Sequence, residues 1–594
     1  DSLHLFLNGK RAGQLNFAGR TVGTTGLLAV STWTGLDLIP GDNLVAVDII
    51  DDLGHLVRHL ERTVHYSGPP VFAEVVLDRS VLVADGKTKP VIALRLTDQT
   101  GYPARREVVG KFSVASPHEA WREKGDSERE SITELQEKLP TYTVGPDGIA
   151  LLQLAPTTAS GEALLSLGLA DNSEDIRVWL QPQSRAWILA GVVEGTVGYN
   201  TVSGNMESLA AADGAEDFYS DGRLAFFAKG SLKGSWLLTL AYDSQDPSDD
   251  PRSGLFGLVD PDAYYTVYGD AVVQKHDAAT GDHLYIRLER EQFYALYGDF
   301  NSGLTVTELS RYSRAMTGFR SSRRGEQTGF DVFASQNRQN FRRDEIRGDG
   351  TSGLYHLSAG RIIAHSEKIT LQTRDRYRSE IILSERHLTR SVDYTLDDLD
   401  GTLFFKEVIP SQDENFNPVW IVAGYETDSG STEEITAGGR GSWRPGGGDL
   451  EVGVTGIRAG TQGGKGDVLA GLDTKWDLTR SLRLKAEYAG SDTRTHGQRA
   501  AWFGELTSRS GPVLGRLYYR DQEAGFGLGQ QNAGETGTRK YGADLRWQQH
   551  AHWRADGTFF TQENLVTSSE RHFGEMKLSH NSRHFTAGLG LRAA

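Results

Sequence analysis

Arginine is concentrated between residues 311 and 343, in a chain whose formal net charge is −16. A guanidinium group pairs with carboxylates and phosphates through two parallel hydrogen bonds. Along a channel lumen, such side chains select anionic solutes or pair with acidic groups of a plug. On a leaflet surface they contact lipid phosphates, and on an ordinary strand face they are only solvated. Five of them are candidate lumen or anion-contact residues: Arg311, Arg314, Arg320, Arg323 and Arg324.

Two Tyr-Gly-Asp triplets, at 268–270 and 297–299, give a second candidate site. Their carboxylates, Asp270 and Asp299, could lie at the rim of a barrel and bind cations or a partner. The alternative, which we favour, is an interfacial tyrosine followed by Gly and Asp residues that end a strand. In either case the repetition indicates a regular array of hairpins.

Other local motifs do not support a metal or phosphate site. The DDLDG segment at 397–401 partly matches a calcium loop, but Leu396 occupies the first ligand position and strands flank the segment, so a hairpin turn fits better. The acidic segment 243–254 is typical of a long solvated loop. In segment 460–466 a glycine follows the lysine, where a phosphate loop needs Ser or Thr.

No sequence feature supports an enzyme. The chain contains neither H-E-x-x-H nor G-x-S-x-G, its 16 histidines do not cluster at ligand spacing, and it has no cysteine. We therefore predict no catalytic, metal-binding or cofactor-binding residue, and no cofactor. The net negative charge argues against a nucleic-acid partner, because such proteins carry basic patches.

The elements that position these residues are β-strands. Residues 282–300 (DHLYIRLEREQFYALYGDF) alternate apolar with polar or aromatic side chains, as one strand requires. Three residues of one face are predicted to contact lipid: Leu284, Ile286 and Leu288. Arg287 and Glu289, on the opposite face, are predicted to point into the lumen.

This alternation recurs over most of residues 186–594, and many apolar stripes end in Tyr or Trp. No stretch approaches the roughly 20 apolar residues of a transmembrane helix. Alternating strands with aromatic ends are typical of a closed antiparallel transmembrane β-barrel, which also explains a hydrophobic content of only 38%. We predict about 16 strands, at about 20 residues per strand and connection. A soluble β-sandwich array or a propeller is the alternative.

Residues 345–426 interrupt the alternation, because their sequence indicates shorter strands and tight Gly/Asp turns. We predict a small β domain inserted between barrel strands, and therefore a candidate plug. The predicted fold class is all-β, and the predicted divisions are 1–68 (β-sandwich, Ig-like), 69–183 (Ig-like, with a charged insertion at 115–140), 184–344 (first part of the barrel), 345–426 (inserted domain) and 427–594 (second part of the barrel).

Turn motifs in the second division carry a resemblance to a known family. The ADGK segment at 84–87, the turn at 98–103 and the GPDG segment at 145–148 resemble the bacterial Ig-like repeats of invasin and intimin proteins. That resemblance implies spacer or adhesive modules in the envelope of a Gram-negative bacterium. Here the modules precede the barrel, so we expect them to lie in the periplasm and to contact periplasmic or cell-wall proteins.

The inserted segment carries looser resemblances. Its VDYTLDDLDGTLFF hairpin resembles segments of large outer-membrane proteins, including the type IX secretion translocon, and a β domain that interrupts a barrel is similar to the plug of fimbrial ushers. Together they imply transport or export across the outer membrane, with lipid as a partner and an unidentified cargo. The alternative is a structural or adhesive protein whose barrel only anchors the Ig-like modules.

The ends of the chain lead to one more expectation. Asp1 leads directly into a strand pattern, and the chain finishes Leu591-Arg592-Ala593-Ala594 instead of on an aromatic residue. These features predict a fragment of a longer chain whose barrel has further strands.

Overall fold

A computed structural model describes residues 2–23, 29–39, 41–51, 53–98, 101–115, 117–121, 140–169, 173–199, 218–233, 235–244, 278, 283–337, 339–363, 366–428, 434–460, 466–479, 481–510, 513–549, 553–581 and 585–593. Almost all regular structure in these residues is β, which confirms the predicted all-β class. The described helices are short 3-10 turns: η1 (Gln14–Asn16), η2 (Leu77–Arg79) and η5 (Pro445–Gly447). None of the helices in the described ranges is long and apolar enough to cross a membrane.

The first part of the chain forms a four-stranded sheet and a separate hairpin. The sheet has the order β2-β1-β5-β6, and the hairpin joins β3 to β4. The bounds are β1 (Ser2–Leu7), β2 (Lys10–Arg11), β3 (Phe17–Val22), β4 (Ala29–Trp33), β5 (Gly41–Ile50) and β6 (Leu56–Tyr66). Leu5 and Ala46 are the only buried hydrophobic side chains among the described residues up to 66. This part therefore lacks the packed core of the predicted β-sandwich.

Residues 69–183 form two sheets that share one apolar core. The orders are β11-β10-β13-β14-β8 and β12-β9-β7. The bounds are β7 (Phe72–Val75), β8 (Val83–Ala84), β9 (Val91–Thr97), β10 (Val109–Val114), β11 (Thr141–Thr143), β12 (Ile149–Gln153), β13 (Gly161–Gly168) and β14 (Ser173–Pro182). Strict alternation along β13 buries Ala163, Leu165 and Leu167 in this core. Most of the predicted charged insertion at 115–140 lies outside the described residues.

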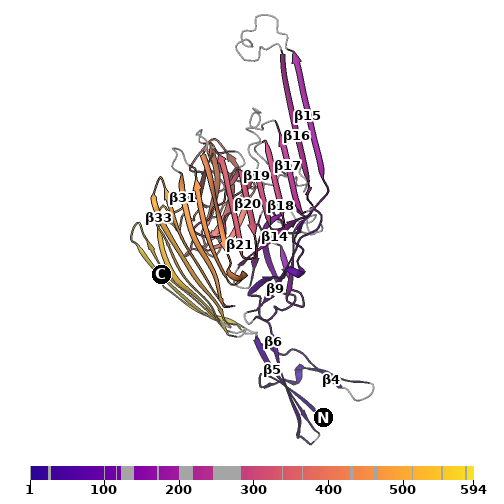
Figure 1. The fold of residues 1–594 in the computed structure, drawn as a ribbon. Helices are drawn as coiled ribbons and strands as arrows, with labels where there is room; N and C mark the ends of the chain where they lie inside the picture. The colour runs from indigo at the N-terminus through magenta and orange to yellow at the C-terminus, as the bar shows by residue number, and fades with distance from the viewer. Residues whose placement is uncertain are drawn as a thin grey trace.

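A 17-stranded antiparallel sheet, the large sheet, follows (Figure 1). Its neighbours follow chain order except at one place, where β21 pairs with β29. The bounds are β15 (Ile188–Tyr199), β16 (Phe218–Leu232), β17 (Trp236–Asp243), β18 (Leu284–Arg290), β19 (Phe293–Asn301), β20 (Ala315–Arg324), β21 (Thr328–Asn337), β29 (Glu434–Trp443), β30 (Leu450–Ala459), β31 (Asp467–Thr479), β32 (Leu482–Thr493), β33 (Gly497–Ser510), β34 (Val513–Gln522), β35 (Thr538–Gln549), β36 (Trp553–Asn564), β37 (Glu570–Asn581) and β38 (Thr586–Ala593).

The large sheet is strongly curved but open. In the described part of the chain β15 pairs only with β16, and β38 pairs only with β37. The predicted large antiparallel sheet is thus confirmed, whereas its predicted closure into a barrel is not found among these strands. Alternation indicates which face of each strand is buried, but closure also depends on strand tilt and stagger, which alternation does not specify.

Between β21 and β29 the chain leaves the large sheet and forms the insert, residues 339–428. Its two sheets have the orders β22-β28-β24-β25 and β23-β27-β26. The bounds are β22 (Gln339–Arg347), β23 (Tyr355–His356), β24 (Lys368–Arg374), β25 (Ile382–Leu388), β26 (Tyr394–Asp397), β27 (Thr402–Phe405) and β28 (Val419–Asp428). Its core includes Leu403, Ile421 and Tyr425. The insert begins before the predicted residue 345 because β22 pairs with β28 and not with the large sheet.

The predicted single strand at 282–300 is a hairpin. β18 ends at Arg290, β19 begins at Phe293, and Glu291 between them has a positive φ of 49°. The two-residue turn shifts the alternation by one residue, because Arg290 lies opposite Phe293, so the face of Ile286 and Leu288 continues with Ala295 and Tyr297 of β19. Glu289 is buried while Leu284, Ile286 and Leu288 lie on the opposite face, and whether that face contacts lipid stays a prediction.

Candidate functional site: the interface between the large sheet and the insert

The concave face of the large sheet carries charged side chains that pair across strands. Arg440 and Asp473 lie 2.6 Å apart, Arg516 and Glu505 2.7 Å apart, and Arg546 and Asp556 2.7 Å apart. The Arg516–Glu505 and Arg546–Asp556 pairs join adjacent strands, whose side chains on one face lie close together in the ladder. Arg440 of β29 reaches Asp473 of β31 across β30, where Gly453 has no side chain. The interior side of the sheet is therefore polar.

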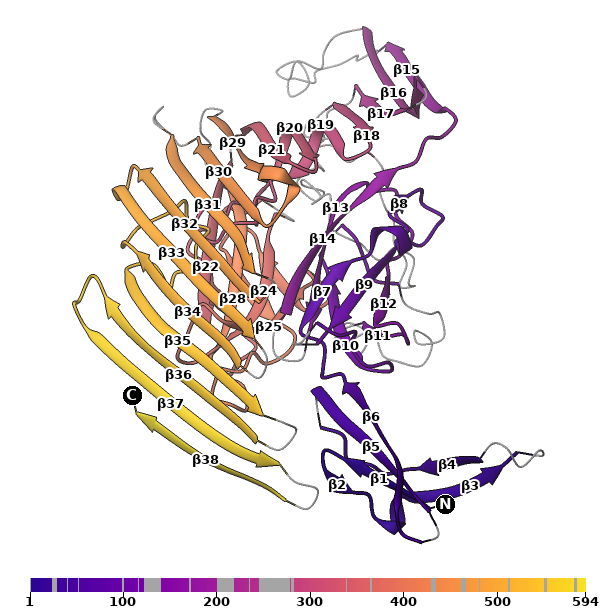
Figure 2. The ribbon, with the colours of Figure 1, turned by 60° about the horizontal axis from the view of Figure 1, so that its bottom comes forward.

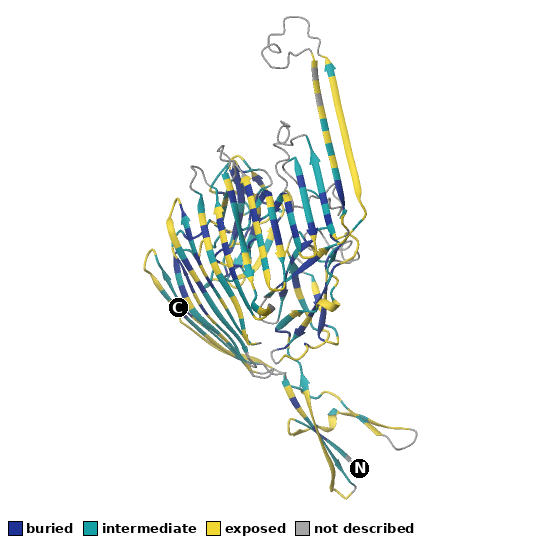
Figure 3. Ribbon diagram, in the orientation of Figure 1, coloured by how far each residue is buried: buried dark blue, intermediate teal, exposed yellow. Residues whose placement is uncertain are grey.

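The convex face is apolar. Exposed and buried residues alternate along its strands (Figure 3). The exposed ones include Leu517 (55%), Leu545 (51%) and Met576 (57%). Aromatic side chains lie towards the two ends of the strands: Trp443, Trp476 and Trp553 at one end, and Tyr488, Trp502, Tyr519 and Tyr541 at the other. A sheet with apolar residues outside and charged residues inside has the reverse distribution of a soluble protein.

The insert lies on the concave side, as Figure 2 shows. Its turn between β24 and β25 reaches the wall of the large sheet at β35. Arg378 Nη1 donates to both carboxylate oxygens of Asp544 at 2.7 Å. Lys540 of β35 is fully buried and donates to Glu380 at 2.7 Å and to Glu535 at 3.2 Å. We call the four residues Arg378, Glu380, Lys540 and Asp544 the wall latch.

A second buried pair holds the other side of the insert. Arg314, just before β20, binds Glu426 of β28 through Nε–Oε1 (2.7 Å) and Nη2–Oε2 (2.6 Å). The side chains are 5% and 6% exposed. Burial raises the pKa of the Glu426 carboxyl, although Arg314 opposes this shift. A pair this deeply buried tolerates the loss of neither partner.

Of two further loops of the large sheet, one is fixed against β32 and the other binds the insert. Glu487 of β32 accepts hydrogen bonds from the backbone N–H groups of 308, 309 and 310 at 2.8–3.0 Å, which fixes the loop before β20. In the loop between β34 and β35, the carbonyls of Gln530 and Gln531 accept from Arg343 of the insert. Asn532 of the same loop accepts from Arg374 at 3.0 Å. The insert is therefore held by wall and loops together.

Residues 69–183 also contact the concave face. Arg324 of β20 lies 2.9 Å from Glu162 of β13. Ser160 donates to Glu289, and Arg287 donates to the Ser160 carbonyl at 2.7 Å. The Trp179 ring lies 6.0 Å from the ring of Tyr294. This part of the chain is thus attached to β18–β20 by both polar and aromatic contacts.

The five candidate arginines differ in their surroundings: three form ion pairs with different parts of the chain, and two are exposed. Arg314 pairs with the insert, Arg324 with residues 69–183, and Arg320 with Asp331 of the neighbouring strand at 2.7 Å. Arg311 and Arg323 are exposed. Arg314 thus pairs with an acidic residue of the insert, and whether the insert acts as a plug stays a prediction. Whether any of them contacts an anion stays a prediction.

The carboxylate candidates are not brought together in the described structure. Asp299 lies near the end of β19 and accepts from Thr317 Oγ1 at 2.6 Å. Asp270 lies outside the described residues, as do most of segments 243–254 and 460–466. The 397–401 segment is the turn of the β26–β27 hairpin, as favoured. Within the described ranges, no group of three or more His, Cys, Asp or Glu side chains could hold a metal ion.

The wall latch was not identified from sequence. Arg378 and Asp544 stand 166 positions apart, and each belongs to an ordinary alternating or turn segment. The one available signal was the charge density of the DRYRSE segment at 375–380, in an otherwise short turn. That signal could indicate a contact, but it could not name the partner.

No protein-family model and no curated protein matches this chain. Among solved structures it is similar to OpdQ of Pseudomonas aeruginosa, with 9% identity over 68% of this chain and 92% of that chain, at a TM-score of 0.26. It is also similar to the P pilus usher PapC translocation pore, with 6% identity over 93% and 88% and a TM-score of 0.24. A BenF-like porin of Pseudomonas fluorescens Pf-5 gives 7% identity over 68% and 93%, and a TM-score of 0.25. We transfer no function from similarities at this level.

Proposed function

We propose that this chain forms the wall and the plug of a transport or export channel in the outer membrane of a Gram-negative bacterium. The reversed polarity of the large sheet carries the proposal. A convex face with Leu517, Leu545 and Met576 exposed suits lipid, and a concave face of paired charges suits a water-filled lumen.

The insert supports a plug role. It lies on the concave side and is held there by ion pairs, through the wall latch and the Arg314–Glu426 pair. Such ion pairs favour one position of the insert, because moving it would leave a buried charge without its partner, and an unpaired buried charge costs free energy. Residues 69–183 also contact the concave side, so we place them at one mouth of the channel, in the periplasm.

Planar-bilayer conductance of the full chain tests the proposal. We expect low conductance for the unaltered protein and a clear increase for the double variant Arg378→Ala, Lys540→Ala, whose wall latch is removed. Lys577→Ala, at an exposed residue of β37, is the matched control and should behave as the unaltered protein. Silence of both the unaltered protein and the latch variant would favour the alternative in which the sheet only anchors residues 1–183.

Membrane fractionation tests both membrane functions, transport and anchoring, against the alternative of a soluble β protein. Recovery of the chain in the aqueous fraction without detergent would contradict the proposed membrane location.

A further inference from the structure

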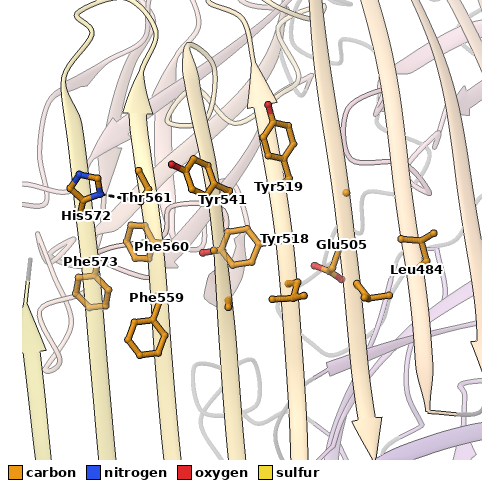
Figure 4. Close-up of a pocket in the computed structure, with 15 residues that line it drawn as sticks. Leu484, Glu505, Tyr518, Tyr519, Tyr541, Phe559, Phe560, Thr561, His572 and Phe573 are labelled. Atoms are coloured by element: carbon orange, nitrogen blue, oxygen red, sulfur yellow. Dashed lines mark hydrogen bonds between the residues drawn. The ribbon is translucent and has the colours of Figure 1, made fainter.

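The turn of the insert that carries part of the wall latch also contacts β37, through Tyr377. The Tyr377 ring lies 4.5 Å from the ring of Phe573 on β37. Phe573 in turn stacks at 5.0 Å on Phe560 of β36, and Figure 4 shows these two side chains on neighbouring strands. Both phenylalanines are buried. The three rings therefore form an apolar floor between the insert and the large sheet.

Three guanidinium groups surround the ring of Tyr377. The Cζ atom of Arg376, on the insert, lies 4.6 Å from the ring centroid. The Cζ atoms of Arg571 on β37 and Arg592 on β38 lie 5.1 Å and 5.4 Å from it. Arg592 also donates to the Tyr377 hydroxyl at 3.2 Å, so the hydroxyl keeps its own hydrogen to donate. We call Arg376, Tyr377, Arg571 and Arg592 the tyrosine site.

The charges of the tyrosine site are not balanced within the described residues. Arg592 pairs with Glu575 of β37 at 2.6 Å. Arg376 and Arg571 form no ion pair with any residue that the structure describes, and Asp413 of the insert accepts from the backbone N–H groups of 415 and 417 instead. Three guanidinium groups less one carboxylate leave two positive charges. Like charges gathered around one ring repel each other, so a bound anion would stabilise this arrangement.

The tyrosine site is open to a ligand. Arg376 is exposed, the Arg592 side chain is 42% exposed, and Arg571 is partly exposed. Because the insert lies on the concave side of the large sheet, a ligand reaches these groups from that side.

We propose that the tyrosine site binds a phosphate group that bridges the insert and the large sheet. Guanidinium groups bind phosphate through paired N–H···O hydrogen bonds. A phosphate monoester carries about −1.5 to −2 charges at pH 7, which matches two unpaired arginines, whereas a carboxylate neutralises only one. Arg376 belongs to the insert and Arg571 to the large sheet, so the bound group adds a contact to those of the wall latch. The inference goes beyond the proposed function, since the site needs neither a lumen nor lipid.

Isothermal titration calorimetry of the full chain in detergent tests the proposal at pH 8, where the probe, inorganic phosphate, is mainly a dianion. We expect a single phosphate per chain. Arg571→Gln should weaken its binding at least about tenfold at constant ionic strength, because a hydrogen bond to a charged group is lost. Arg376→Gln should show the same loss, and its exposed position keeps the test valid where Arg571→Gln fails to fold. Arg554→Gln on β36 is the matched control, because its 41% exposed side chain binds Asp556, outside the tyrosine site.

A second titration, with dihexanoyl phosphatidic acid, distinguishes the source of the phosphate. Tighter binding of this soluble lipid than of inorganic phosphate identifies a lipid head group, and binding that is no tighter identifies a soluble solute. Acetate that binds as well as phosphate overturns the inference. Equal phosphate binding by the unaltered protein and both site variants also overturns it, as does the absence of binding by the unaltered protein. None of these results bears on conductance, which tests the proposed function.

Discussion

The Lys540 ammonium group lies 2.7 Å from a carboxylate oxygen of Glu380, and the lysine side chain is 0% exposed. Lys540 belongs to β35 of the large sheet and Glu380 to the insert. Burial of a charge is costly unless a partner compensates it, so this contact ties the position of the insert to one place on the wall.

Removal of that lysine should release the insert. Lys540→Ala leaves Glu380 and Glu535 buried without their cation, and we expect a loss of about 3–5 kcal/mol in the free energy of unfolding. Urea unfolding followed by tryptophan fluorescence measures it, and limited proteolysis should cut within 339–428 faster. The exposed Lys577→Ala should change the free energy by less than about 0.5 kcal/mol. Equal effects of the two substitutions would mean that the wall latch does not hold the insert.

The Arg314–Glu426 pair permits a sharper test, because both partners can be replaced. Arg314→Met should destabilise the protein by about 3–5 kcal/mol, since it leaves a buried carboxylate. The double variant Arg314→Met, Glu426→Leu should recover most of that loss, because two apolar side chains leave no unpaired charge. The exposed Arg323→Ala is the control. Additive losses in the double variant would contradict a direct pairing of the two charges.

Much of the large sheet could be predicted from sequence, but its long-range contacts could not. The period of two along β32 and β34 indicates which side chains share a face, because that periodicity is a property of each strand alone. Arg314 stands out only as one of several arginines, and nothing local to it indicates Glu426, 112 positions later. That β15 and β38 do not pair within the described part of the chain was missed for the same reason, since closure depends on strands far apart in the chain.

The convex face gives a prediction whose magnitude depends on the surroundings. Leu517 is 55% exposed, so Leu517→Arg would change the stability of a soluble protein by less than about 0.5 kcal/mol. In lipid, arginine at mid-membrane costs about 2–4 kcal/mol. We expect the larger cost in vesicles, also for Ile286→Arg on β18. Leu56→Arg, at an exposed position of β6, is the control and should be close to neutral. A neutral effect at Leu517 in vesicles would place the convex face outside lipid.

The junction between the first two parts of the chain should respond to pH through His65. Its Nδ1 lies 2.7 Å from Asp42 and its Nε2 2.9 Å from Asp98, while its ring stacks on Tyr102 at 3.9 Å. Burial alone would lower the pKa of His65, but the hydrogen bonds to Asp98 and Asp42 outweigh it and raise that pKa above 6.5. The contact therefore stabilises the junction fully below pH 6.5, and the stabilisation is lost as the pH rises through the folded-state pKa.

Spin labels can measure this directly, because the chain contains no native cysteine to block. With cysteines placed at the exposed Leu15 and Leu77, the distance distribution between the two parts should broaden as the pH rises from 6 to 9. His65→Gln should remove the pH dependence, since the neutral side chain cannot form the charged contact with Asp98. His59→Gln should keep it, because His59 binds Asp48 and Glu61 within the first sheet. A distribution that broadens equally in the His65 variant would assign the pH response to another group.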